Sequence, residues 1–372
     1  MLAPTHSRRF ATAVLLAAGA AAVAGVTGAI IGPGFGSAPL RVGAISSAPI
    51  GATSNPIPAL QSAGLWLSGV PGGPQALRGR VVVVNFWTYS CINSLRALPY
   101  LRTWNERYGS KGLTVVGVHA PEFQFEHDPA KVRLAARQLG VSYPNLQDNN
   151  YAVWQQFSNE GWPGFYFIDA QGRMRGYRVG EGKYAEAEQF IRELLTEAGQ
   201  DLSTVETAPI IGTGIEAEAD WAHLRSPESY VSYGKGEGFS SPGGFSPDAS
   251  RDYGPASELM LNRWDLSGSW TVGREFTTLD QSGGSIRFRF QARDMHLVLG
   301  GAADGEPIRF RVTIDGSAPG NDHGADVDAD GWGAVKEDRL YQLVRQSDEI
   351  VDRTVTIEFA RPEVRAYAFT FG

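Results

Sequence analysis

The stretch Trp87-Thr88-Tyr89-Ser90-Cys91-Ile92-Asn93-Ser94 decides the fold of this chain. Four valines at residues 81–84 precede it, and an apolar run of this kind is typical of a strand buried on both faces. Leucines and Trp104 recur at helical spacing after it, so residues 94–108 are predicted as a helix. Cys91 therefore lies at a strand-to-helix junction, where backbone N–H groups and the helix dipole favour a thiolate.

Cys91 is the only cysteine among the 372 residues. A single cysteine excludes an intramolecular disulfide and a cysteine-based zinc site. Ser94 stands three residues later, where a second thiol would complete a Cys-x-x-Cys redox pair. The pattern indicates a redox centre with one thiol. Its alternative is an inert buried cysteine that packs as a small hydrophobic residue.

The segments that follow have the order of an α/β domain. Further strands are predicted at residues 113–118, 165–168 and 174–179, and further helices at 129–139, 151–157 and 185–198. A strand–helix–strand unit followed by a hairpin and a terminal helix is the thioredoxin order. We therefore expect a thioredoxin-like domain over residues 64–200.

Three segments together resemble the TlpA/DipZ family of envelope thioredoxin-like proteins: residues 87–96, Gly117-Val118-His119-Ala120-Pro121-Glu122-Phe123, and Trp162-Pro163. The resemblance continues through Leu261-Asn262-Arg263-Trp264, Trp270-Thr271-Val272-Gly273, residues 292–298 and Arg339-Leu340-Tyr341-Gln342-Leu343. It covers residues 64–372 and is nearest to the C-terminal half of the DipZ type. In that half, a thioredoxin-like domain precedes a carbohydrate-binding-module-like β domain.

The resemblance implies that Cys91 attacks a partner disulfide and that Ser94 cannot resolve the resulting mixed disulfide. Ser94 would instead offer a hydrogen bond near the sulfur. It further implies a cis Pro163 that shapes a groove for an extended substrate. The predicted catalytic residues are Cys91, Ser94 and Pro163, and the predicted groove residues are Trp87, Trp162 and Glu122.

His119 and Glu122 follow the C-terminal end of the strand predicted at residues 113–118. A carboxylate or imidazole at this edge can move protons during thiol exchange. For His119 we favour a purely structural role, and for Glu122 both roles stay open.

The C-terminal part changes to a period of two. Residues 285–290, 308–314 and 365–371 alternate between apolar and polar side chains, and residues 340–344 and 355–359 are further strand candidates. Short alternating strands between turns predict an antiparallel jelly-roll domain, galactose-binding-like, over residues 256–372. Residues 201–255 are rich in Pro, Gly and Ser, and we expect a transitional segment there.

Two features of this part suggest ligands. Asp326, Asp328, Asp330, Gly331 and Glu337 have the spacing of a calcium loop. Because the flanks read as turn and strand, we expect an acidic hairpin and no metal, with calcium left as an open alternative. The family resemblance also implies a glycan partner, for which the candidate stacking residues are Trp264, Trp270, Trp332 and Tyr341.

The N-terminal sequence is typical of an export signal. Arg8 and Arg9 precede a stretch without charge that extends to residue 40, and its apolar core at residues 10–31 exceeds the ~20 residues that span a bilayer. We expect a signal peptide or membrane anchor over residues 1–40 and a flexible linker over 41–63. The net charge of −7, without a basic block beyond the N-terminus, argues against a nucleic-acid partner.

These features predict an exported, extracytoplasmic protein that carries out thiol–disulfide exchange on envelope proteins through Cys91 and needs no cofactor. A membrane electron donor is a further expected partner. One alternative is a single-cysteine peroxidase, since Thr88-x-x-Cys91 matches the peroxiredoxin core, although Val84 replaces its preceding proline. The other alternative is a non-catalytic envelope scaffold with a decayed site.

Overall fold

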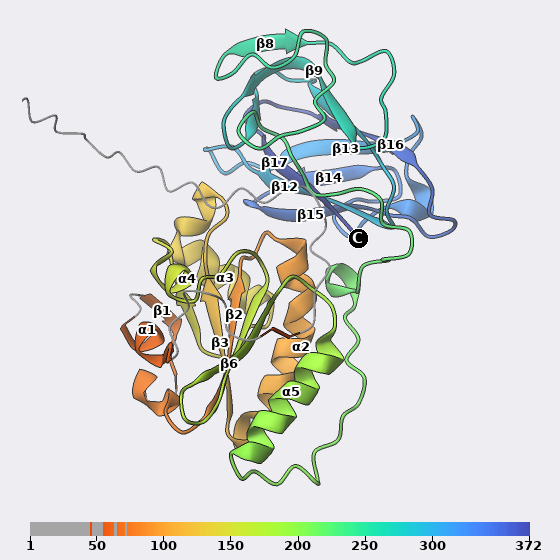
Figure 1. The fold of residues 1–372 in the computed structure, drawn as a ribbon. Coiled ribbons are helices and arrows are strands. Elements are labelled where there is room, and N and C mark those ends of the chain that lie inside the picture. The colour runs from red at the N-terminus through yellow and green to blue at the C-terminus, as the bar shows by residue number, and fades with distance from the viewer. Residues whose placement is uncertain (1–44, 47–54, 63–64, 71–72) are drawn as a thin grey trace, which may run out of the picture. The chain divides into compact units, whose positions relative to one another are not determined.

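The computed structural model describes residues 45–46, 55–62, 65–70 and 73–372, which all belong to one unit of the chain (Figure 1). The predicted export segment at residues 1–40 lies outside these residues. Among the helices of the described part, none is both long and apolar enough to cross a membrane.

The first half is built on a six-stranded sheet with the order β1-β4-β3-β2-β5-β6. These strands are β1 Leu65–Ser68, β2 Val81–Trp87, β3 Leu113–His119, β4 Asn145–Gln147, β5 Gly164–Ile168 and β6 Met174–Val179. Strands β2, β3 and β4 run parallel, whereas β5 is antiparallel to β2, and β6 to β5. The predicted thioredoxin-like order is thus confirmed.

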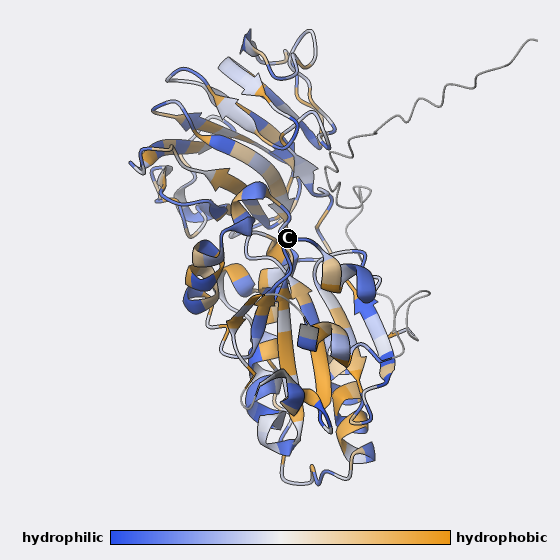
Figure 2. Ribbon diagram, turned by 90° about the vertical axis from the view of Figure 1, so that its left-hand side faces the viewer, coloured by the Kyte–Doolittle hydropathy of each residue, from blue (hydrophilic) through white to orange (hydrophobic). Residues whose placement is uncertain are grey.

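Helices cover both faces of this sheet. They are α1 Ile57–Ser62, α2 Ile92–Tyr108, α3 Pro129–Gln138, α4 Ala152–Gln156 and α5 Tyr184–Glu197. Alternate valines of β2 enter opposite cores: Val81 and Val83 pack with α2, α3 and α5, and Val82 and Val84 pack with α1 and α4. Figure 2 shows these central strands in orange, as expected for strands without a solvent face.

The prediction of a flexible linker over residues 41–63 is wrong at its C-terminal end. Residues 57–62 form α1, and Ile57 and Leu60 are buried in the core that contains Val82 and Val84. Burial of the apolar side chains of this short segment stabilises a helix, although the surrounding Pro- and Ser-rich sequence is typical of a linker.

The second half is a large, curled antiparallel sheet with the path β14-β13-β16-β11-β9-β10-β17-β12-β15, on which β7 pairs with β17 and β8 with β9. The strands are β7 Ser229–Tyr230, β8 Ser250–Tyr253, β9 Arg263–Val272, β10 Thr277–Leu279, β11 Ser285–Phe290, β12 Asp294–Gly300, β13 Ile308–Ile314, β14 Trp332–Val335, β15 Arg339–Arg345, β16 Arg353–Phe359 and β17 Arg365–Phe371. All five strands predicted for this half are present.

Strand β9 marks the point where the sheet turns. Its first part pairs with β11, and its second part pairs with β8 and β10. Between them, Gly268 has a φ of 92°, which favours glycine, and a side chain there would meet the backbone of Gly284. The curl brings Phe288 of β11 within 4.8 Å, between ring centroids, of Phe369 of β17, so the inner faces pack on each other.

The two halves share one apolar core. Val298, Leu340 and Tyr367 of the curled sheet belong to the same buried cluster as α2 and α3. In addition, Arg96 of α2 forms a buried ion pair with Glu181 at 3.1 Å and donates to the Phe371 carbonyl at 3.4 Å. The N-terminal end of α2 is therefore held against the end of β17.

Candidate active site around Cys91

Cys91 is the N-cap residue of α2, as the strand-to-helix pattern predicts. Its amide donates to the Thr88 carbonyl at 3.4 Å, and its carbonyl accepts from the Leu95 amide at 3.1 Å. Ser94 is buried, and its Oγ accepts from the Thr88 amide at 3.4 Å. The serine therefore closes the turn that carries the thiol.

The pKa of Cys91 is shifted in the direction opposite to the expected one. Burial raises the pKa of the thiol well above its ordinary value, the carboxylates of Glu122 and Glu228 add to this, and hydrogen bonding by Ser94 opposes it. The thiol is 7% exposed, so little water remains to stabilise a thiolate. This shift is opposite in direction to the one expected from the helix N-terminus alone.

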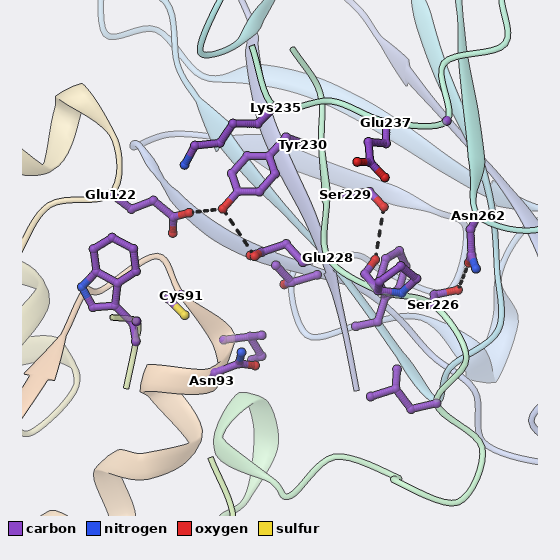
Figure 3. Close-up of a pocket in the computed structure, with 18 of the residues that line it drawn as sticks. Cys91, Asn93, Glu122, Ser226, Glu228, Ser229, Tyr230, Lys235, Glu237 and Asn262 are labelled. Carbon is purple, nitrogen blue, oxygen red and sulfur yellow. Dashed lines mark hydrogen bonds between the residues drawn. The ribbon is translucent and has the colours of Figure 1, made fainter. Parts of the chain in front are cut away.

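Cys91 opens onto a cavity of about 540 Å³ whose walls come from both halves of the chain (Figure 3). The thioredoxin-like half contributes Asn93, Glu122 and Trp162 beside the cysteine. The second half contributes residues 226–230 and the loop that carries Lys235. The site is thus enclosed by a segment more than a hundred residues away in the sequence.

An acidic cluster lies beside the sulfur. The Tyr230 hydroxyl donates a short hydrogen bond to Glu122 and lies 3.4 Å from Oε2 of Glu228, with the two carboxylates on opposite sides of it (Figure 3). The Lys235 ammonium lies 4.6 Å from the centre of the Tyr230 ring. Sequence reasoning missed Glu228, Tyr230 and Lys235, because no local pattern connects them to Cys91.

The pKa values of the two glutamates in the acidic cluster are also shifted. Burial raises the pKa of Glu122, which Lys235 and the Tyr230 hydroxyl partly offset. Enclosure by the surrounding chain and the Glu122 carboxylate raise the pKa of Glu228 to about 8. Because the Glu228 side chain stays exposed to the cavity, water there moderates this shift.

The predicted groove residues divide into two groups. Trp162 and Glu122 line the cavity with Cys91, and the Trp162-Pro163 peptide bond is cis, as expected. Pro163 itself is not among the residues that line the cavity. Its carbonyl accepts a hydrogen bond from the Gly180 amide at 2.8 Å. The prediction for Trp87 is wrong: its ring is fully buried and its Nε1 donates to Asn145 at 3.0 Å.

His119 has the structural role that we favoured. It is fully buried between the rings of Trp87 and Tyr89, with centroid distances of 5.3 and 5.6 Å. Burial lowers its pKa to about 3, so the imidazole stays neutral. It therefore does not change its protonation state near neutral pH.

Glu126 organises the loop beside the site, in the 3₁₀ helix Gln124–His127. Its carboxylate accepts hydrogen bonds from the hydroxyls of Thr88 and Ser90 and from the amides of Glu122 and Phe123. The Thr88 hydroxyl, which the peroxidase alternative places at the reacting sulfur, is thus bonded to a buried carboxylate. Sequence reasoning did not single out Glu126, because the hydroxyls that it accepts from lie more than thirty residues earlier in the chain.

The candidate ligand features of the second half have structural explanations. Asp326 accepts from Arg339, and Asp328 from the amides of Asp330 and Trp332. Among the described residues, no group of three or more His, Cys, Asp or Glu side chains is placed to hold a metal ion. The acidic segment is a hydrogen-bonded turn, as we favoured.

Most of the candidate sugar-stacking residues are in the core. Trp264, Trp270 and Tyr341 are fully buried, so the prediction that they offer stacking faces is wrong. Trp332 is 38% exposed, but Arg309 and Arg311 lie over its ring. Inward-facing aromatic residues of a sheet are more often core than binding residues, and this sheet follows that rule.

Comparisons with known proteins cover both halves. Residues 52–191 match the Redoxin family, and residues 226–372 match the family described as thioredoxin like C-terminal domain. Protein DipZ of Mycobacterium tuberculosis is 35% identical over 259 residues, which are 67% of this chain and 36% of DipZ. The chain therefore spans about a third of the length of this relative.

Other relatives cover the thioredoxin-like half. Thiol-disulfide oxidoreductase YkuV of Bacillus subtilis is 28% identical over 142 residues, 38% of this chain and 95% of YkuV. A solved structure of a secreted Mycobacterium tuberculosis disulfide oxidoreductase covers 36% of this chain and 97% of its own, with 24% identity and a TM-score of 0.30. The chain thus contains a region that matches the Redoxin family, followed by a region that matches the thioredoxin like C-terminal domain family, and it is similar in sequence to DipZ and to the thiol-disulfide oxidoreductase YkuV.

Proposed function

We propose that this protein carries out thiol–disulfide exchange on proteins of the cell envelope, with Cys91 as its only nucleophile. The observation that carries the proposal is the position of Cys91: it caps α2 at the end of β2 and faces a cavity beside Trp162. The homology to thiol-disulfide oxidoreductases supports the reaction class.

The reaction has two steps. The Cys91 thiolate attacks one sulfur of a partner disulfide, the partner S–S bond breaks, and the other partner sulfur leaves as a thiolate. Since Ser94 has no thiol, the mixed disulfide is released only when a thiolate from another molecule attacks it. Trp162 and Glu122 line the entry to the sulfur, and Ser94 keeps the turn that carries Cys91 closed.

The wider setting belongs to the same proposal. Export by the segment at residues 1–40, a membrane electron donor and a glycan partner remain predictions, as does the jelly-roll topology of the second half. The domain limits 64–200 and 256–372 are too narrow at their N-terminal ends, because α1 packs in the core of the first half and β7 and β8 pair with strands of the second sheet. Of these predictions, export bears most directly on function, because disulfide chemistry on proteins is concentrated outside the cytosol.

The proposal is tested by trapping the mixed disulfide. The reduced full chain is incubated with insulin, and covalent adducts are separated without reductant. We expect an adduct that persists until dithiothreitol is added, and none with Cys91→Ser. Ser94→Cys restores a second thiol, so it should release the adduct without dithiothreitol. A wild-type chain that forms no adduct would refute the proposal.

A second candidate, a non-catalytic scaffold, is favoured by one observation: the thiol is nearly buried and its pKa is raised. The same experiment separates the two functions. A scaffold would keep its partners when Cys91 is replaced by serine, whereas an exchange protein would lose its covalent partners.

A further inference from the structure

The absence of a second thiol at Ser94 raises the question of what reacts with Cys91 in its place. Residues 226–238 of the second half border the site, so a molecule that reaches the sulfur has to enter the cavity of about 540 Å³. Pockets for small ligands have volumes of roughly 300–1,000 Å³. The space beside Cys91 therefore fits a compact molecule.

We propose that this cavity binds a small, amine-bearing disulfide, or the thiol derived from it, as the redox partner of Cys91. The inference rests on the proposed thiol exchange and names the class of its second reactant. Its basis is the combination of an enclosed cavity, a thiol in its wall and the charges that surround that thiol.

The charges favour a cation. Four glutamates line the cavity, against one lysine and one arginine: Glu122, Glu181, Glu228, Glu237, Lys235 and Arg263. Glu181 is neutralised by its ion pair with Arg96, but Glu122 and Glu228 flank Tyr230 on the side of the cavity that holds Cys91. The pKa of Glu228 is raised to about 8, so its carboxylate is charged above that pH, and disulfide exchange is therefore measured at pH 8.5. Lys235, whose ammonium lies 4.6 Å from the centre of the Tyr230 ring, compensates part of this charge, and an ammonium group of a bound molecule beside the two carboxylates would add to the compensation.

An unpaired polar group in the wall provides an independent reason to expect a ligand. Thr370 of β17 lines the cavity and is 3% exposed, and its hydroxyl has no hydrogen-bond partner among the described residues. An unsatisfied buried hydroxyl costs stability, and such groups are normally paired.

The exchange balances without another reactant. The Cys91 thiolate attacks one sulfur of the disulfide R–S–S–R, that S–S bond breaks, and R–S⁻ leaves with the bonding pair and takes up a proton. A thiolate of the substrate protein then attacks the R sulfur of Cys91–S–S–R and frees the Cys91 thiolate. The protein thiol is oxidised to a mixed disulfide while one R–S of the small disulfide is reduced to R–SH, and the sequence also runs in reverse.

A cationic R group also helps the first step. Glu122 and Glu228 oppose formation of the thiolate at Cys91. An ammonium beside them offsets their charge while the disulfide is bound, so the partner itself favours the reactive form of the thiol. An anionic disulfide would have the opposite effect.

Three disulfides that differ in charge test this inference on the full chain: cystamine, bis(2-hydroxyethyl) disulfide and dithiodiglycolate. The rate of Cys91 mixed-disulfide formation is followed by intact mass and divided by the rate with N-acetylcysteinamide, which removes differences in intrinsic reactivity. We expect the normalised rate to be at least about tenfold higher for cystamine than for dithiodiglycolate at low salt. Glu228→Gln should reduce this ratio about threefold, whereas the remote and exposed Glu349→Gln should leave it unchanged.

The outcomes separate the two proposals. Equal normalised rates for the three reagents, or a preference unaffected by Glu228→Gln, would overturn the cationic partner while leaving exchange by Cys91 intact. No adduct with any reagent would remove exchange itself. A cystamine preference that falls with Glu228→Gln but not with Glu349→Gln supports the inference.

Discussion

Glu122 and Glu126 are four residues apart on the loop after β3, yet their surroundings differ completely. Glu126 is fully buried and accepts four hydrogen bonds from neighbouring hydroxyls and amides. Glu122 faces the cavity and accepts a hydrogen bond from the hydroxyl of Tyr230, which comes from the other half of the chain. The first carboxylate holds the loop together, and the second acts on the thiol.

The difference shows what makes a carboxylate structural or functional in this fold. Burial raises the pKa of both residues, so the direction of the shift does not distinguish them. Their partners do: every donor to Glu126 lies within the thioredoxin-like half, whereas Glu122 joins an acidic cluster that affects Cys91.

Glu126→Ala should have the largest effect. It leaves two hydroxyls and two amides without their acceptor, and at about 1 kcal/mol for each hydrogen bond we expect a loss of about 3–4 kcal/mol in the free energy of unfolding. Urea denaturation measures this loss. Gln124→Ala, on the exposed side of the same turn, is the matched control and should cost less than about 0.5 kcal/mol. A similar cost for both variants would contradict the structural role of Glu126.

The stability contributed by Glu126 should also depend on pH. Burial raises its pKa from 4.5 to about 7, so the folded state prefers the protonated carboxyl. This contribution is complete below about pH 4.5 and is lost as the pH rises through 7. Relative to Glu126→Gln, the wild type should lose up to about 3 kcal/mol between pH 5 and pH 8. A difference that is constant over this range would show that Glu126 is not titrating.

Glu122→Gln should change reactivity rather than stability. Removing one of the two carboxylates that raise the pKa of Cys91 should increase the rate of its alkylation at pH 8 by about tenfold. The unfolding free energy should change by less than about 1 kcal/mol, because the amide can still accept from Tyr230. If Glu122→Gln instead destabilised the chain as much as Glu126→Ala, the distinction between the two residues would fail.

His119→Gln should have the smallest effect. The imidazole is neutral and packs between two rings, so the alkylation rate of Cys91 in the folded variant should stay within about twofold of the wild-type rate. Near-UV circular dichroism verifies that the variant is folded. A tenfold slower reaction would give His119 a proton-transfer role after all.

The sequence was sufficient where structure is local. The valines of β2 and the spacing of α2 identified the thioredoxin-like half, period-two alternation found three strands of the curled sheet, and two further strand candidates were also correct. Trp162 lines the cavity with Cys91, and the peptide bond between Trp162 and Pro163 is cis, as expected. In each case the signal and the structure involve neighbouring residues.

The rest depends on contacts between distant segments. Tyr230 and Glu228 reach Cys91 only because β7 pairs with β17, which is a pairing that no local pattern reveals. Trp87 looked like a groove residue, but its indole nitrogen finds Asn145 on a neighbouring strand and the ring turns inward. The pKa of Cys91 reverses its expected direction for the same reason, since one of the two carboxylates that raise it comes from the second half.

The most direct test of this account is the pH dependence of Cys91 alkylation in the wild-type chain. We expect an apparent pKa above the ordinary value of about 8.5, which falls when Glu122 and Glu228 are both replaced by glutamine. An apparent pKa at or below about 8.5 in the wild type would contradict this expectation, because the carboxylates of the cavity would then not raise the pKa of the thiol.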